Sequence, residues 1–144
     1  MIRWAGRLIV LVGAGHLLIA LALYARPHFG AWFSGALWGE DLAAMSDAGA
    51  ALWLTIDSFS VPLVLVGLIV LWLDRQGLTP PPFLAWTLGV WAVIEAVIFG
   101  PSPSWLLPVA AGLLLAGARR AKRPDSTEAA RAVTSPSAGP SAQG

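Results

Sequence analysis

Four long apolar stretches, separated by short polar segments, dominate the pattern of hydrophobic and polar positions. They cover about residues 5–25, 49–73, 82–99 and 104–118. Each is continuously apolar over about 15 to 25 residues, close to the ~20 residues that an α-helix needs to cross a bilayer. Strands of a membrane barrel would instead alternate apolar and polar positions. The pattern therefore predicts an all-α fold, specifically an integral membrane four-helix bundle.

The segment between the first two stretches, residues 26–48, carries large apolar side chains at helical spacings between polar ones. These side chains are Trp32, Phe33, Leu37, Trp38, Leu42 and Met45. Tryptophan is enriched at the depth of the lipid headgroups, so the segment is predicted to form an outer interfacial helix. A loop folded over the mouth of the bundle fits the same pattern. Ser46 and Asp47 are predicted to cap the second span.

The composition changes after residue 120. Residues 121–144 are rich in Ala, Ser and Pro and contain no aromatic residue. Such a segment has too little apolar surface to form a packed structure. We therefore predict one membrane domain over residues 1–120 and a disordered cytoplasmic tail over residues 121–144.

Composition and charge support this interpretation and orient the chain. Of the 144 residues, 57% are hydrophobic and only 12% are charged. Cytoplasmic segments of membrane proteins are enriched in Lys and Arg. Here one side carries only Arg26, while the other carries Arg3, Arg7, Arg75, Arg119, Arg120, Lys122 and Arg123. This distribution predicts a multi-pass protein of the plasma (inner) membrane with both termini in the cytoplasm.

The first 25 residues also fit a second interpretation. They have an Arg-bearing start, an apolar centre and Ala-Leu-Ala at positions 20–22, which together are typical of a cleaved signal peptide. Removal of this segment would leave three spans, and the predicted orientation would then no longer agree with the distribution of Lys and Arg.

Three ionisable residues, His16, Asp57 and Glu95, fall inside the apolar stretches. A charge at the centre of a membrane helix costs roughly 2.5 to 3.5 kcal/mol, so such residues usually face the interior of a bundle or a wet cavity. Counting the helical rise from the outer ends places all three in the outer half of the bilayer. They are predicted to form one cluster that opens outward.

Helical spacing predicts which residues lie on the same helix face as Asp57 and as Glu95. Trp53 and Ser60 share a helix face with Asp57, and Trp91 shares one with Glu95. Pro62 cannot donate a backbone hydrogen bond and is expected to kink the second span beside Ser58. The predicted ligand-binding residues are therefore His16, Trp53, Asp57, Ser60, Trp91 and Glu95.

Purely structural roles would also account for some of these polar residues in the apolar stretches. Ser58 and Ser60 would satisfy the kinked backbone, with Asp57 hydrogen-bonded to them. His16 would form one hydrogen bond between helices, where Gly13 and Gly15 let a neighbouring helix approach. The sequence does not decide between these roles and the pocket.

Several kinds of chemistry are not indicated. The chain has no cysteine, which excludes disulfides and thiolate ligands. It contains no phosphate-binding loop, dinucleotide fingerprint or nucleic-acid motif. One imidazole and two carboxylates are acceptable metal ligands, but their spacing does not require a metal. We predict no cofactor, no metal and no nucleic-acid partner.

Two segments carry a resemblance to a known type of protein: "GAGHLLIAL" in the first stretch, and "WAVIEAVIFGPSPSWLLPVAAGLLL" across the last two. Over about residues 1–120 the chain resembles an uncharacterised family of small four-helix bacterial membrane proteins, which has no assigned activity. In outline it is also similar to emopamil-binding membrane proteins, whose inward acids hold cationic or sterol-like ligands.

These observations predict a binding protein for a small apolar or amphipathic molecule, with an acidic pocket lined by aromatic side chains. Its predicted partners are the bilayer and that ligand, and its oligomeric state is not predicted. The same residues would serve a proton-coupled transporter, in which one acid exchanges a proton for substrate. They would also serve a membrane-embedded acid/base isomerase or cyclase. Whether the protein is an enzyme is left open.

Overall fold

The computed structural model describes residues 1–100 and 103–134, and within these ranges every regular element is a helix. The longer elements are α1 (Ile2–Ala20), α3 (Asp47–Leu54), α4 (Ser60–Arg75), α5 (Pro82–Phe99) and α6 (Leu106–Thr134). Shorter ones are a π-helical turn (Leu21–Ala25), α2 (Phe29–Phe33) and 3₁₀ turns at Arg26–His28, Leu42–Ala44 and Pro103–Trp105. The predicted all-α fold is confirmed.

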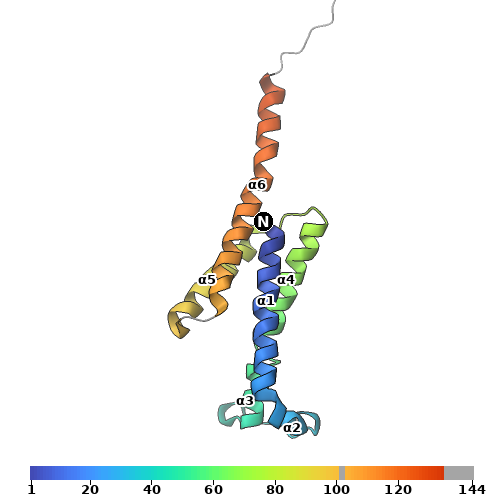
Figure 1. Cartoon of the computed structure of the whole chain (residues 1–144), viewed down its shortest axis with the longest axis vertical. Helices are drawn as coiled ribbons and strands as arrows, with labels where there is room; N and C mark the ends of the chain where they lie inside the picture. The colour runs from blue at the N-terminus through green and yellow to red at the C-terminus, as the bar shows by residue number, and fades with distance from the viewer. Residues whose placement is uncertain (101–102, 135–144) are drawn as a thin grey trace, which may run out of the picture.

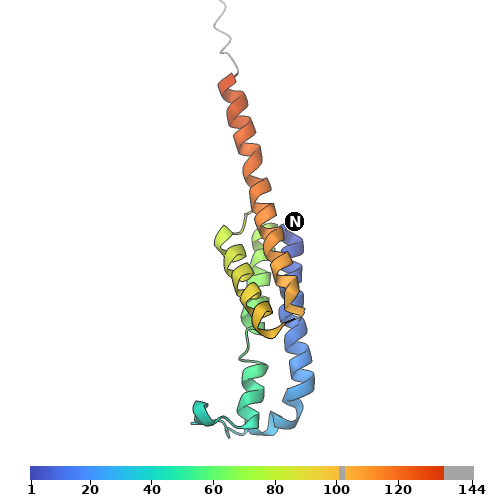
Figure 2. The same cartoon turned by 90° about the vertical axis from the view of Figure 1, so that its left-hand side faces the viewer.

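The long helices pack as an open row, in the order α4, α1, α6, α5. Helix α1 packs against α4 on one side and α6 on the other, and α5 packs on α6 (Figure 1). Figure 2 shows α5 and α6 side by side as a hairpin. No extensive backbone contact joins α4 to α5. The buried core includes Ile9, Leu63, Val70, Leu107 and Leu114.

Glycines let the backbones of α1 and α4 approach closely. A Cβ atom built on Gly13 would lie 2.9 Å from the carbonyl oxygen of Ser60, and one on Gly67 would lie 2.9 Å from the backbone nitrogen of Val10. The prediction that Gly13 admits a neighbouring helix is therefore correct. The same prediction for Gly15 is wrong, because no atom of another element lies within 4 Å of its Cβ position.

The helix at the N-terminus is longer than predicted. It continues from Ile2 through the π-helical turn to Phe33, a length of 32 residues, and is long and apolar enough to cross a membrane. In the ranges that the structure describes, it alone meets that criterion; the apolar helix Pro82–Ile98 is shorter. The structure thus supports one candidate span near the N-terminus.

The second apolar stretch forms two helices instead of one kinked helix. Helix α3 ends at Leu54 and α4 begins at Ser60, so residues 55–59 form a break. Pro62 lies in the first turn of α4, where a backbone donor has no helical partner in any case. The disturbance predicted near Ser58 is present, but it consists of this break and not of a kink at Pro62.

Residues 26–33 continue the N-terminal helical run as a 3₁₀ turn and α2, and residues 34–46 fold into short turns, so the segment is not one continuous interfacial helix. The indole nitrogen of Trp32 donates a 2.8 Å hydrogen bond to the carbonyl of Ala48, which ties the segment to α3. The hydroxyl of Ser46 accepts a hydrogen bond from the backbone of Gly49, as expected for the predicted cap. These turns lie at the end of the molecule opposite the N-terminus (Figure 1).

The tail predicted to be disordered begins within a helix. Helix α6 continues to Thr134, so residues 121–134 are helical, and Figure 1 shows α6 extending past the end at which α1 begins. Extending an existing helix is easier than nucleating one, and this segment contains helix-forming Ala, Glu and Arg. The prediction for residues 135–144 lies outside the described residues.

Candidate functional site

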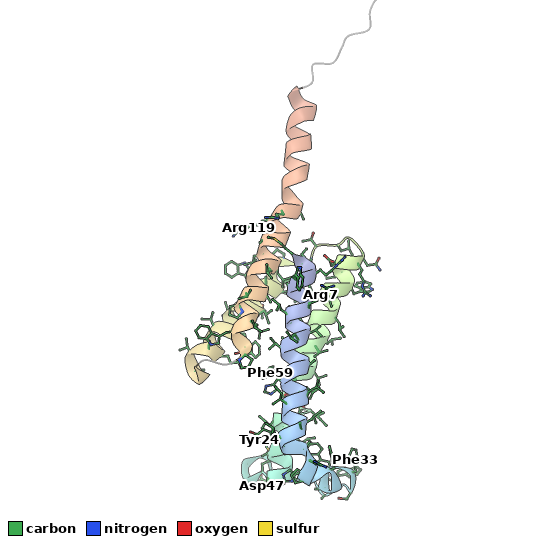
Figure 3. The ribbon with its side chains drawn as sticks, viewed as in Figure 1. Arg7, Tyr24, Phe33, Asp47, Phe59 and Arg119 are labelled. Carbon is green, nitrogen blue, oxygen red and sulfur yellow. The ribbon has the colours of Figure 1, made fainter. Side chains whose placement is uncertain are left out.

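The ring of Phe59, the last residue before α4, joins three parts of the fold. Its centroid lies 4.7 Å from that of the His16 ring on α1 and 5.3 Å from that of the Trp91 ring on α5, the latter in an edge-to-face arrangement. Figure 3 shows Phe59 beside α1. Side chains from α1, the break and α5 therefore meet here, although the backbones of α4 and α5 are not packed together.

Two buried polar atoms, one on His16 and one on the helix that carries Trp91, have no partner. Nε2 of His16 and Oε2 of Glu95 are inaccessible to solvent and make no hydrogen bond within the described ranges. Glu95 follows Trp91 by one helical turn, so the two side chains share a face of α5. A buried polar group without a partner costs about 1–3 kcal/mol, and in a native structure it commonly marks a functional role or a missing partner.

Hydroxyl groups stabilise the break that presents Phe59. The Thr55 hydroxyl donates to the carbonyl of Ala51 at 2.6 Å, and the Ser58 hydroxyl donates to the carbonyl of Thr55 at 2.7 Å. The hydroxyls of Ser58 and Ser60 lie 2.7 Å apart and are hydrogen-bonded. The Ser58 hydroxyl therefore satisfies part of the interrupted backbone, at the carbonyl of Thr55 and the N–H of Ser60, but neither serine is hydrogen-bonded to the Asp57 carboxylate. Ser60 is buried next to the cluster with its hydroxyl already paired.

Asp57 and Trp53 do not share a buried face with Ser60 next to this cluster. Both side chains are exposed, whereas Ser60 is fully buried. The Asp57 carboxylate makes no hydrogen bond or ion pair with the described part of the chain. The shared face predicted for these residues assumed an uninterrupted helix, and the break at 55–59 removes that relation. Of the three ionisable residues predicted to cluster, His16 packs against Phe59 and Glu95 follows Trp91 by one turn of α5, whereas Asp57 is exposed.

Phe59 is the residue that the sequence reasoning missed. No sequence signal marks it, because only the tertiary arrangement brings its ring to those of His16 and Trp91. Trp91 also borders a shallow hollow of about 450 Å³ on α5, with Trp86, Thr87, Val90 and Ile94. This hollow is open and almost entirely apolar. In residues 1–100 and 103–134, no three His, Asp or Glu side chains are grouped closely enough to hold a metal ion.

Comparison with known proteins places the chain in a family. A family model described as a family of unknown function, DUF6463, matches residues 1–121. The chain belongs to this family. The match to DUF6463 confirms the predicted membership of an uncharacterised family, and it includes every residue of the cluster around Phe59. No curated protein and no solved structure matches the chain.

Proposed function

We propose that this DUF6463 protein is a four-span plasma-membrane protein that binds a small amphipathic molecule. The binding site consists of His16, Phe59, Trp91 and Glu95. The observation that carries this proposal is the presence of two buried, unpaired polar atoms, on His16 and Glu95, beside the paired rings of Phe59 and Trp91. A bound molecule with one polar group would satisfy atoms that the chain itself leaves unsatisfied.

The exposed apolar surface supports a membrane location. Large apolar side chains are exposed along all the long helices, including Leu18, Leu65, Leu68, Trp86, Val97 and Val109. Soluble monomers rarely expose apolar patches of this extent, whereas lipid is the natural solvent for them. The lengths of α4 and α5, together with the first part of α6, are compatible with further crossings beside the N-terminal helix.

The charges at one end support an orientation with both termini in the cytoplasm. Arg7 and Arg119 lie toward the same end of the molecule, as Figure 3 shows. At that end Arg3 forms a 3.1 Å ion pair with Asp74, which joins the start of α1 to the last turn of α4. Exposed Trp4 and Trp72 lie near the same helix ends, at positions typical of the headgroup layer. The positive-inside rule assigns this end to the cytoplasm.

The chemistry of the site favours a lipophilic amine. The Glu95 carboxylate accepts hydrogen bonds, and the faces of Phe59 and Trp91 attract a cation. An imidazole nitrogen of His16 donates or accepts, depending on its tautomer. The apolar surface of α5 beside Trp91 would accommodate an alkyl chain. An alkylammonium ion satisfies all of these groups at once.

Binding of octylammonium provides the test, with 1-octanol as the probe that shares its chain but lacks its charge. For protein in phosphatidylcholine nanodiscs, Glu95→Gln is expected to weaken octylammonium binding at least ~10-fold, since a hydrogen bond to a charged group contributes about 1.5–3 kcal/mol. Binding of 1-octanol should change little. Isothermal titration calorimetry against empty nanodiscs measures both affinities.

Asp57→Asn is the matched control, because it removes a carboxylate that is exposed and does not face the cluster. Its effect on octylammonium affinity should stay below about threefold, as expected for a screened charge. Equal losses in the two variants, or native protein that prefers neither probe over empty nanodiscs, would refute the proposed site.

A further inference from the structure

The backbone of the break at residues 55–59 is only partly hydrogen-bonded. The N–H groups of Ile56, Ser58 and Phe59 make no hydrogen bond with the described part of the chain. The side chains of Ile56 and Asp57 are exposed on the outside of the molecule. Non-helical backbone is not tolerated where it faces lipid chains, and it occurs at membrane depth only where protein or water covers it. The break therefore requires contact with water or with lipid headgroups.

Helix lengths place the break at the outer edge of the hydrocarbon layer. From the arginine-bearing end, the 16 residues of α4 rise about 24 Å and the 18 residues of α5 rise about 27 Å, both just below the ~30 Å of a hydrocarbon core. Figure 1 shows that the α5–α6 hairpin ends well short of the outer turns around α2 and α3. Gly100 and the break thus both mark the outer ends of helices that nearly span the hydrocarbon core.

The N-terminal helix reaches beyond this layer. Its part up to Ala25, of 19 residues in α1 and five in the π-helical turn, rises about 36 Å, compared with ~30 Å for the hydrocarbon core, and α2 then turns away from the axis of α1 (Figure 1). The part of this helix beyond α1, together with α3 and the outer turns, then lies in the outer headgroup layer. Exposed Trp53 next to the break and Trp105 after the hairpin turn fit that interface. This arrangement moves the outer end of the second span from residue 49, where the apolar stretch begins, to about Asp57.

We infer that the break is a hydrated entrance, through which the polar end of the ligand passes from the outer headgroup layer to Glu95 and His16. Phe59 belongs both to the break and to the cluster, so the entrance leads directly to the unpaired atoms. The ligand is then an amphiphile of the outer leaflet or the outer aqueous phase, not a cytoplasmic molecule. This inference rests on the proposed function and adds the side from which the site is reached.

Labelling of single cysteines tests the hydration, because the chain contains no cysteine of its own. A membrane-impermeant maleimide is added to intact cells that express Trp38→Cys, Ile56→Cys, Asp57→Cys or Leu65→Cys. Trp38 is 91% exposed in the outer turns, and Leu65 is exposed on α4 inside the hydrocarbon layer. We expect Ile56→Cys and Asp57→Cys to react within about threefold of the rate of Trp38→Cys, and Leu65→Cys at least ~100-fold more slowly.

The outcomes test the hydrated entrance and the orientation of the protein in the membrane separately. If Trp38→Cys reacts but Asp57→Cys is as slow as Leu65→Cys, the break is in lipid and the entrance is refuted, while the orientation stands. If Trp38→Cys reacts only after the cells are permeabilised, the orientation is refuted and the outward entrance with it.

Blocking the entrance tests its connection to the site. A bulky maleimide attached to Asp57→Cys should slow octylammonium association in nanodiscs at least ~10-fold, whereas the same group on Trp38→Cys should leave the rate unchanged. Unmodified Asp57→Cys protein serves as the reference. An unchanged rate after complete modification would refute the entrance, although binding itself, and thus the proposed function, would remain.

Discussion

Replacing Glu95 with leucine is expected to raise the thermal midpoint of the unliganded protein while it abolishes octylammonium binding. Oε2 of Glu95 is buried without a hydrogen-bond partner, which costs about 1–3 kcal/mol of folding free energy. Leucine removes that penalty and retains apolar volume beside Trp91. Most core substitutions lower stability, so an increase identifies a side chain that is retained for a reason other than folding. Thermal unfolding in detergent, followed by intrinsic tryptophan fluorescence, measures the midpoint.

Three further variants isolate the cause of this increase. Glu95→Gln keeps a polar group in the buried position and should not raise the midpoint. His16→Leu removes the other unpaired atom and should raise it as Glu95→Leu does. Asp57→Leu changes a carboxylate that is already exposed, so its effect should remain within about 0.5 kcal/mol. A midpoint that falls in both Glu95→Leu and His16→Leu would mean that these groups stabilise the fold, contrary to the proposed site.

The parts of the candidate site that could be predicted were those that depend on single helices. Glu95 and Trp91 share a face of α5 because that helix is continuous, and the cost of a charged group in an apolar stretch drew attention to His16, whose ring packs against Phe59. Asp57 was assigned to the same cluster by helical spacing across a segment that is not helical. A break of five residues in the helix is enough to change the direction of the Asp57 side chain. Neither the length nor the apolar character of the second stretch predicts that break.

Contacts between helices were less predictable than the helices themselves. Phe59 joins α1 to α5 although it belongs to neither, and only the tertiary arrangement brings its ring to His16 and Trp91. Gly13 and Gly15 are equivalent in sequence terms, yet only Gly13 faces α4. The last helix continues to Thr134, past Pro124, although proline disfavours a helix interior and the segment has little apolar surface to bury.

The close contact between α1 and α4 makes Gly67→Val the most destabilising substitution that we predict. A Cβ atom at this position would lie 2.6 Å from Cγ2 of Val10 and 2.9 Å from the Val10 backbone nitrogen. The neighbouring side chain has alternative rotamers, but the backbone of α1 has none, so the two helices must move apart. Overpacking of this kind costs about 1–3 kcal/mol or more. We expect a lower thermal midpoint and a lower yield of folded protein from membranes.

Gly112→Val is the matched control for this prediction, because Gly112 is also inside a helix but no atom of another element lies within 4 Å of its Cβ position. Both variants introduce the same β-branched side chain, so the difference between their midpoints reports the α1–α4 contact and not helix propensity. Since α1 and α4 hold His16 against Phe59, Gly67→Val should also weaken octylammonium binding, whereas Gly112→Val should not. Equal midpoints would show that α1 and α4 do not approach as closely as these glycines indicate.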